Sequence, residues 1–338
     1  MTLDRRGPAP VIVTLTPNPS VDRTVELTSA LQRGAVLRSA ASSAQAAGKG
    51  VNISRAAVAA GLPTIAVLPA DPEDPYVLEL LAAGIDCRPE PTSGGVRTNL
   101  TITEPDGTTT KINSPGATAG PELLGRLRTA LGHRSRGAAW VVLAGSLPPG
   151  APDDWYATLV ADLVAGSAED GHDARALAVA VDTSGAPLQA VAAHLPVAAP
   201  ALMKPNAEEL ASLTGADPDA IEADPVAAAR AAATLVERGV GAVLATLGAG
   251  GAVLVTAEGS WHATPPPTAV VSTVGAGDSS LFGYLLGALR GEDAPGRLRL
   301  AVAYGSAAAG LPGTTIPTPD HVSPELVDVA ELPVPTTT

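Results

Sequence analysis

Short apolar segments alternate with amphipathic segments along most of this chain, and this alternation constrains the possible folds more than any other feature. Apolar runs of a strand's length occur at residues 11–16, 64–69, 138–146, 176–182, 199–206 and 241–248. Between them, apolar residues recur three or four positions apart in the expected helices 50–61, 121–132, 153–166 and 224–239. Strands that are apolar throughout must be covered on both faces, so the pattern predicts an α/β fold with a mostly parallel central sheet.

Two stretches, at about 20–45 and 88–113, depart from the alternation because no helix is available to cover them. A turn at residues 105–107 (PDG) indicates a hairpin in the second stretch. Strands that stand clear of an α/β body suggest a small sheet serving as a lid or a dimer contact, although a surface extension without a role would have the same pattern. We expect one domain at residues 10–316, with these lid strands inserted into it, and tails at residues 1–9 and 317–338.

The charge balance excludes some classes of partner. The 338 residues include 21 Lys and Arg against 34 Asp and Glu, a net charge of -13. Sequence-independent binding to nucleic acid or to an anionic membrane needs clustered cations, so we expect neither partner. No apolar run approaches the roughly 20 residues of a membrane helix, and the single Cys87 allows neither a disulfide within the chain nor a cysteine-based zinc site. These features predict a cytoplasmic protein.

Lysine and asparagine are scarce and concentrated. The eight residues of these two types are Lys49, Lys111, Lys204, Asn18, Asn52, Asn99, Asn113 and Asn206. All lie in or beside motifs rich in Gly or Pro. An ammonium is a compact donor and an amide combines a donor with an acceptor, which suits a tight polar site. The preference of Asn for turns offers a simpler explanation.

The strongest local signal for a ligand site is the segment 272–280, STVGAGDSS. Leu281, Leu285 and Leu289 share one helical face, so a helix is expected to begin near Asp278, directly after a glycine-rich turn. The unpaired N–H groups of a first helical turn carry partial positive charge and form a cradle for an anion. Asp278 is then either an ordinary N-cap or a general base that takes a proton from a hydroxyl attacking the bound phosphate.

Two further motifs point to phosphate chemistry. MKPNAEEL places Lys204 and Asn206 at the carboxyl end of an expected strand, where ligands bind in parallel sheets. Asn206 and Glu209 could hold Mg²⁺ through water, or Glu209 could be no more than a favourable charge in a first helical turn. AAGKGVN sets Lys49 between two glycines before another helix, which is either a second phosphate-binding turn or a flexible loop.

Together and in this order, the motifs resemble those of the ribokinase-like carbohydrate kinases of the phosphofructokinase B family. The shared motifs, within about 11–316, are TLTPNPSVDRTVEL, AAGKGVN, RTNLTI, GSLPPG, DTSG, KPNAEEL, TLGAGG and STVGAGD. PNP followed by Val21 and Asp22, together with AAGKGVN, looks most like the 1-phosphofructokinase branch. The resemblance implies a three-layer α/β/α domain and a β-sheet lid that often pairs with a second subunit, so a homodimer through the lid is expected.

The resemblance also implies an ATP- and Mg²⁺-dependent phosphotransferase with an alcohol acceptor (1-phosphofructokinase, EC 2.7.1.56). The expected reaction is phosphorylation of the 6-hydroxyl of D-fructose 1-phosphate to give fructose 1,6-bisphosphate. One alternative is a 6-phosphofructokinase or tagatose-6-phosphate kinase that acts at the 1-hydroxyl. A less favoured alternative is a non-catalytic sensor of a sugar phosphate or a nucleotide.

Roles for individual residues are carried over from the matched motifs. Asp278 would be the catalytic base, and after Gly275 the N–H groups of Ala276, Gly277 and Asp278 itself would form the anion hole for the transferred phosphoryl group. Asn206 and Glu209 would position Mg²⁺ through water. The residues expected at the nucleotide are Lys204, Asn206, Thr246, Gly248, Gly250 and Gly251. Those expected around the sugar phosphate are Asp22, Gly48, Lys49, Asn52, Arg97, Asn99 and Ser146.

One position departs from the family pattern. Many 1-phosphofructokinases carry a lysine in the lid strand where this chain has Thr101. Lys111, on the next expected strand, could supply that charge. The departure bears on which sugar phosphate is bound rather than on the reaction.

Overall fold

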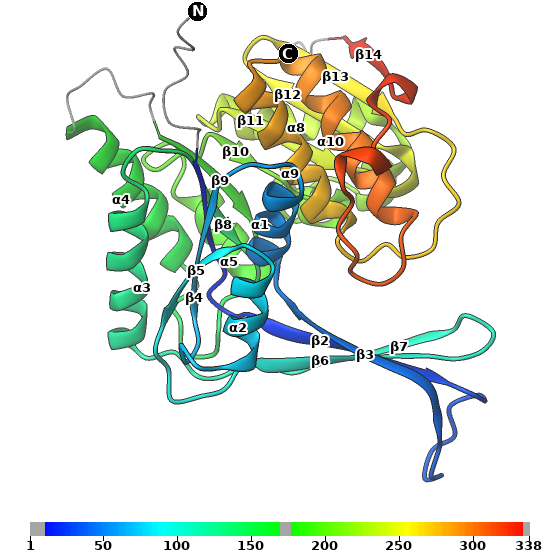
Figure 1. Cartoon of the computed structure of the whole chain (residues 1–338). Coiled ribbons are helices and arrows are strands. Elements are labelled where there is room, and N and C mark those ends of the chain that lie inside the picture. The colour runs from blue at the N-terminus through cyan, green and yellow to red at the C-terminus, as the bar shows by residue number, and fades with distance from the viewer. Residues whose placement is uncertain (1–10, 170–176, 334–338) are drawn as a thin grey trace, which may run out of the picture.

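The structure, a computed structural model, describes residues 11–169 and 177–333. Within them the chain forms a ten-stranded sheet covered by helices and a separate four-stranded sheet (Figure 1). This is the expected three-layer α/β/α arrangement with a small second sheet. The expected tail at residues 1–9 lies outside the described residues.

The large sheet has the strand order β14-β13-β12-β11-β10-β9-β8-β1-β4-β5. Its parallel strands are β1 (Val11–Leu15), β4 (Thr64–Pro69), β5 (Asp86–Glu90), β8 (Ala138–Ala144), β9 (Ala178–Asp182), β10 (Leu202–Met203) and β11 (Ala242–Thr246). The antiparallel strands that extend it are β12 (Ala252–Thr256), β13 (Gly259–Thr264) and β14 (Asp328–Leu332). All six apolar runs noted in the sequence form parallel strands. The parallel strand β5 lacks such a run because it is a polar edge strand.

Side chains alternate along each strand, so Val13 and Leu15 face one helical layer and Ile12 faces the other. The first layer contains α3 (Pro121–Arg134), α4 (Trp155–Glu169), α5 (Gly185–Ala193), α6 (Ala207–Thr214), α7 (Pro218–Ala223) and α8 (Pro225–Glu237). The second contains α1 (Lys49–Ala59), α2 (Pro75–Ala82), α9 (Ala276–Arg290) and α10 (Ala294–Ala309). None of the described helices has both the length and the apolar character needed to span a membrane.

Helix α9 packs closely against α10 because glycines line their contact. Gly283 and Gly287 lie so near Leu300 and Arg297 of α10 that a β carbon at either glycine would collide with the backbone there. Every residue from Asp278 to Gly287 is buried. This packing fixes the N-terminus of α9, and with it Asp278, over the sheet.

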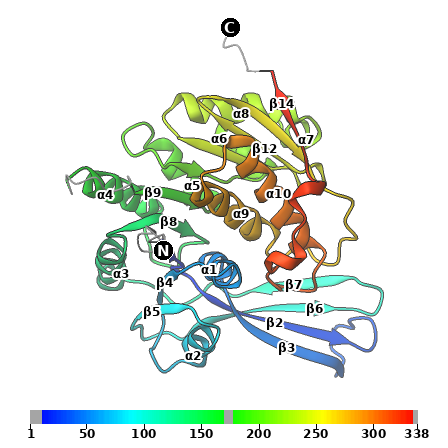
Figure 2. The same cartoon turned by 45° about the horizontal axis from the view of Figure 1, so that its top comes forward.

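The small sheet, called the lid below, projects from one end of the body (Figures 1 and 2). Its strand order is β3-β2-β6-β7. The bounds are β2 (Ser20–Leu27), β3 (Ser39–Ala47), β6 (Arg97–Thr103) and β7 (Thr109–Asn113). β2 pairs in parallel with β6, and the outer pairs are antiparallel. The strands fall within the two stretches for which no covering helix was expected.

The register of the lid gives it two different faces. Residues directly opposite one another in a sheet point to the same side. One side, the polar face, carries Asp22, Gln45, Asn99, Thr101 and Lys111. The other, the apolar face, carries Val25, Leu100, Ile102 and Ile112. Ile112 is 55% exposed, so the outer part of the apolar face is uncovered within a single chain.

Two expected boundaries differ in the structure. Residues 88–90, expected at the start of the second lid stretch, belong to β5 of the large sheet. Much of the expected C-terminal tail is structured: η2 (Pro319–His321), η3 (Pro324–Leu326) and β14 follow one another, and β14 pairs with β13. The Pro- and Thr-rich composition obscured a short edge strand that packs on the core through Val329, directly after the buried residue Val327 of the same cluster. Residues 334–338 lie outside the described range.

Candidate active site

The glycine-rich turn leads into α9 two residues earlier than expected. Gly275 is the N-cap, with φ 80°, a left-handed conformation that favours glycine. The first intrahelical bond runs from Ser279 N to Gly275 O at 2.9 Å, so the N–H groups of Gly277 and Asp278 precede it. Asp278 therefore lies inside the first turn, and the alternative that it is an N-cap is wrong.

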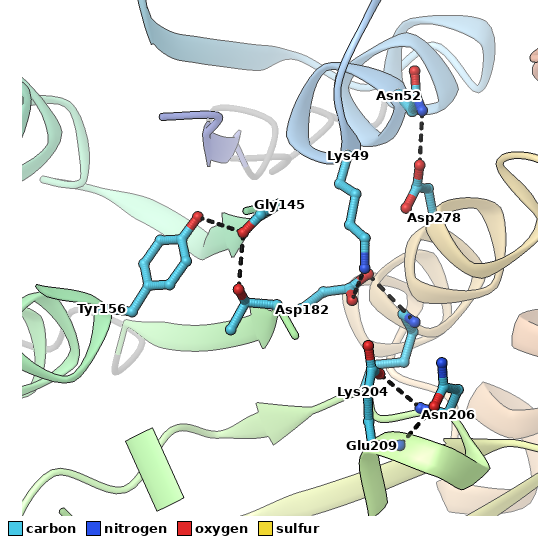
Figure 3. A network of polar contacts seen from close by, with 10 residues as sticks. Lys49, Asn52, Gly145, Tyr156, Asp182, Lys204, Asn206, Glu209 and Asp278 are labelled. Carbon is cyan, nitrogen blue, oxygen red and sulfur yellow. Dashed lines mark hydrogen bonds and ion pairs between the residues drawn. The ribbon is translucent and has the colours of Figure 1, made fainter. Parts of the chain in front are cut away.

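The Asp278 carboxylate is buried, with 7% of the residue exposed. Asn52, on α1, donates from Nδ2 to Asp278 Oδ2 at 2.7 Å (Figure 3). Burial raises the pKa of Asp278 to about 6, and the negative charge of Asp182 adds to this rise, while Lys49, the Asn52 bond and Lys204 oppose it. Asp278 is thus an acid whose proton affinity is unusually high, held in place by one amide.

Asp182, at the carboxyl end of β9, lies between two lysines (Figure 3). Lys49 Nζ donates to Oδ1 at 2.7 Å, and Lys204 Nζ lies 3.3 Å from Oδ2. The Asp182 side chain is 0% exposed. Burial works against its charge, but Lys204 and Lys49 outweigh burial and lower the pKa of Asp182. Burial likewise opposes the charge of Lys49, but the negative charges of Asp182, Asp278 and Glu209 together outweigh burial and raise the pKa of Lys49.

Lys204 also reaches the turn before α9. Its backbone N–H donates to Val181 O at 3.1 Å, which aligns the end of β10 with β9. A β carbon on Gly277 would lie 3.3 Å from Lys204 Nζ. The absence of a side chain at Gly277 therefore lets the ammonium lie beside the first N–H groups of α9, an arrangement that could cradle an anion.

The lid residues expected at the sugar phosphate form a second polar group. Asp22 Oδ1 accepts from Asn99 Nδ2 at 3.0 Å and from Ser20 Oγ at 2.9 Å. This group adjoins the N-cap of α1, because Gly48 lies against Pro19 and its φ of 131° suits glycine. The next residue is Lys49, so Gly48 links the lid pair to the buried cluster.

Arg97 and Ser146 complete the expected set. Arg97 donates to Ser114 O at 2.9 Å and lies 3.4 Å from Ser146 Oγ. Burial lowers the pKa of Arg97, with Asp22 opposing. Asn18 Nδ2 lies 3.4 Å from the same Ser146 Oγ. Arg97 and Asn18 also line one pocket with glycines 94 and 95 and Pro148.

The residues expected at the nucleotide follow β10 and β11. Asn206 caps α6 and forms an isolated parallel bridge with Thr246. The turn η1 (Gly248–Gly250) begins two residues later, and Gly251 follows with φ 86° and a closely approaching Ala263 carbonyl. The structure therefore places this group at the carboxyl edge of the sheet, after β10 and β11.

Asn206 and Glu209 form a capping box, which bears on the expected magnesium site. Asn206 Oδ1 accepts from Glu209 N at 2.7 Å, and Glu209 Oε2 accepts from Asn206 N at 2.9 Å. The sequence offered either a metal role for both residues or a first-turn charge for Glu209, and the capping box is a further role that leaves Glu209 Oε1 unused by the cap. Mg²⁺ keeps several waters and needs only one or two carboxylates beside substrate phosphates, so the residues fit a water-mediated site. The described residues contain no cluster of three or more His, Cys, Asp or Glu that could hold a metal directly.

Asp182 and Asn18 are the site residues that sequence reasoning left without a role. Asp182 follows a wholly apolar strand, which is the same signal that singled out Lys204, and it stands in the DTSG motif. Asn18 belonged to the scarce asparagines and donates to Pro115 O at 3.1 Å. The pairing of Asp182 with Lys49 could not be inferred because the two residues lie 133 positions apart along the chain.

A parallel sheet whose carboxyl edge gathers two lysines, two carboxylates and the glycine-rich turn before α9, with a separate β lid, has the architecture of a ribokinase-like kinase. The solved phosphofructokinase-2 from Escherichia coli in complex with substrates and products has a TM-score of 0.80 to this chain at 28% identity, covering 92% of this chain and 96% of that one. Arabidopsis thaliana ribokinase complexed with ribose and ATP shares the fold with a TM-score of 0.65 at 21% identity, covering 90% and 94%.

Sequence comparison identifies the family. The chain matches the pfkB family of carbohydrate kinases over residues 16–321. It is 35% identical to the 1-phosphofructokinase of Rhodobacter capsulatus over 316 residues, covering 92% of this chain and 94% of that protein. It is 36% identical to the 1-phosphofructokinase of Xanthomonas campestris pv. campestris over 274 residues, covering 80% and 82%. The protein belongs to the pfkB family of carbohydrate kinases, and it is a phosphotransferase with an alcohol acceptor.

The Asp182 cluster predicts a large effect on stability. Asp182→Asn leaves Lys204, whose side chain is 5% exposed, without its counter-charge. Removing one partner of a buried pair costs about 3–5 kcal/mol, so the free energy of unfolding should fall by that order in urea titrations. The matched control is Asp162→Asn, which breaks a pair with Arg128 in which Asp162 is 37% exposed. That change should cost less than about 1 kcal/mol, and equal losses in both variants would contradict the assignment.

Proposed function

We propose that this protein is an ATP-dependent kinase that transfers a phosphoryl group to the 6-hydroxyl of D-fructose 1-phosphate and forms fructose 1,6-bisphosphate. The observation that carries the proposal is the position of Asp278. Its buried carboxylate has a raised pKa and lies in the same helical turn as the N–H groups that would form the anion cradle. A proton acceptor beside a phosphoryl-binding turn is what transfer to an alcohol needs.

Asp278 is the base in this proposal. Asn52 holds Oδ2 at 2.7 Å, and we assign the acceptor hydroxyl to Oδ1. The hydroxyl oxygen attacks the terminal phosphorus of ATP, the bond from that phosphorus to the ADP oxygen breaks, and the hydroxyl proton passes to Asp278. A pKa near 6 makes this carboxylate a stronger proton acceptor than an ordinary aspartate, while leaving it ionised at neutral pH.

The cradle stabilises charge during the transfer. Phosphoryl transfer proceeds through a loose transition state in which catalysis consists mainly of positioning and charge stabilisation. The N–H groups of Gly277 and Asp278 and the Lys204 ammonium would face the migrating group. Asn206 and Glu209 would hold Mg²⁺ through water, and the ion would neutralise nucleotide phosphates. Gly248, Gly250 and Gly251 would leave room for the rest of the nucleotide.

The lid and α1 recognise the sugar phosphate in this proposal. Asp22 would accept hydrogen bonds from sugar hydroxyls, and Lys49 and Arg97 would face the phosphate. Lys111 lies directly opposite Thr101 across β6 and β7, and both are on the polar face with Asn99. This register supports the idea that Lys111 supplies the charge that other family members place at the position of Thr101.

Two alternatives remain distinct from this proposal. A 6-phosphofructokinase or a tagatose-6-phosphate kinase would use the same base and cradle but would place the other end of the sugar at Asp278. A non-catalytic sensor would need no acid of raised pKa beside the cradle. The named relatives favour fructose 1-phosphate.

The substrate is tested by ADP release with fructose 1-phosphate, fructose 6-phosphate and tagatose 6-phosphate under identical conditions. We expect the highest kcat/KM for fructose 1-phosphate. A clear preference for either 6-phosphate would replace the proposed acceptor with the alternative. No ADP release with any of the three would favour a sensor, and direct binding of the sugar phosphates would then be measured by calorimetry.

The base is tested by Asp278→Asn and by the pH profile. Only ionised Asp278 accepts a proton, so kcat/KM in the wild type should fall about tenfold per pH unit below the pKa of about 6 and level off above it. Asp278→Asn should lower kcat by about 10²–10⁴ with little change in the affinity for fructose 1-phosphate. Asp162→Asn serves as the control for an aspartate outside the site. A kcat unchanged in Asp278→Asn would reject the base.

We also propose a homodimer in which the apolar faces of two lids pack together. Leu100, Ile102 and Ile112 form a continuous apolar strip across β6 and β7, and a sheet face of this kind is stabilised by covering. The lid of a second copy of this chain offers an apolar face of the same composition to cover it.

The dimer is tested by sedimentation velocity. Ile112→Asp puts a charge into the apolar face and should convert a dimer to a monomer. Thr109→Asp, on the same strand but on the polar face, should leave the dimer intact. A wild-type monomer, or equal dissociation of both variants, would contradict the proposed interface.

A further inference from the structure

The segment between α10 and η2, residues 310–318, contacts the lid through a side-chain hydrogen bond. Thr314 Oγ1 donates to Gln45 Oε1 at 2.8 Å. Gln45 lies on β3 directly opposite Asp22 of β2, so both side chains are on the polar face of the lid. In Figure 2 the chain after α10 descends toward the lid. The bond therefore joins the C-terminal part of the body to the strand pair that carries Asp22.

The same segment is bonded to the turn that begins α9. Ser272 Oγ donates to Gly313 O at 3.0 Å, and Val274 N donates to the same Ser272 hydroxyl at 3.2 Å. Val274 immediately precedes Gly275, the N-cap of α9. Consecutive hydrogen bonds thus run from Gln45 of the lid, through residues 313 and 314, to the anion-binding turn.

The Thr314 bond differs from the local bonds that threonine hydroxyls often make in turns. The neighbouring Thr315 makes such a local bond, because its hydroxyl donates to Pro312 O, three residues back, at 2.7 Å. Thr314 instead reaches a residue 269 positions away in the sequence. Both Thr314 and Gln45 are half-buried, so the bond is partly shielded from water, which would otherwise compete for it.

We propose that Thr314 and Gln45 are positioning residues that tie the lid to the turn before α9, so that the acceptor site and the phosphoryl cradle become ordered together. This inference rests on the proposed function, in which the lid binds the sugar phosphate and the turn binds the transferred group. If one substrate orders both the lid and the turn, the other substrate loses less binding free energy to ordering them. Linkage requires the effect to be reciprocal for the two binding constants.

The test measures the dissociation constant of fructose 1-phosphate by calorimetry, with and without a saturating non-hydrolysable ATP analogue. We expect the analogue to tighten binding in the wild type by about two- to tenfold, the range that one hydrogen bond can supply. Thr314→Val should abolish most of this factor, and Thr314→Ser, which keeps the hydroxyl, should restore it. Thr315→Val, in the same segment, should leave it unchanged. A factor retained in Thr314→Val, or lost equally in Thr315→Val, would overturn the proposal.

Amide hydrogen exchange tests whether Thr314 couples the lid to the turn before α9, independently of kinase activity. In the free protein, Thr314→Val should speed amide exchange in two separate places, residues 42–46 of the lid and residues 272–276 of the turn. Thr315→Val should speed exchange only near its own position. If Thr314→Val changed exchange at residues 312–316 alone, the coupling would be refuted even in an active kinase. If neither substrate bound, the proposed function would fail, while the exchange pattern would still report on the link.

Discussion

The charge balance around Asp182 is the constraint on which the rest of the site depends. Two ammonium groups that converge in a largely buried place need a counter-charge, and Asp182 supplies it from the end of β9 with a side chain that is 0% exposed. The same carboxylate joins α1, which brings Lys49, to β10, which brings Lys204. Its negative charge also contributes to the raised pKa of Asp278. Asp182 thus influences Lys49, Lys204 and the proposed base Asp278 at once.

The local charges contrast with those of the whole chain. A protein of net charge -13 repels anionic substrates at long range. The three lysines of the chain are placed where they offset this repulsion: two converge on Asp182, and Lys111 is on the polar face of the lid. The rest of the positive charge is carried by arginine, so the lysines are confined to this cluster and the lid. The compositional clue in the sequence therefore marks the polar groups of these two places.

Elements that depend on a local sequence pattern could be predicted from the sequence. Contacts between residues far apart in the sequence could not. The apolar runs identified the parallel strands, because burial on both faces requires such runs, and the glycines identified the turn before α9. The start of α9 was placed too late because Gly275 caps the helix without a polar side chain. β14 was missed because an edge strand needs few apolar residues. The contacts of Asp182 with Lys49, and of Asn52 with Asp278, join residues more than a hundred positions apart, which no local pattern encodes.

The division of the site between lid and body has a chemical reason. A base with a raised pKa that faced water beside ATP would also promote transfer to water, so such a base is useful only when the acceptor excludes water from it. Asn52 belongs to α1, which begins at the foot of the lid, and it already holds one oxygen of Asp278. The residues that would recognise the acceptor therefore also orient the carboxylate that would activate it. Selection of the sugar phosphate and activation of its hydroxyl are consequently parts of one polar network rather than two separate tasks.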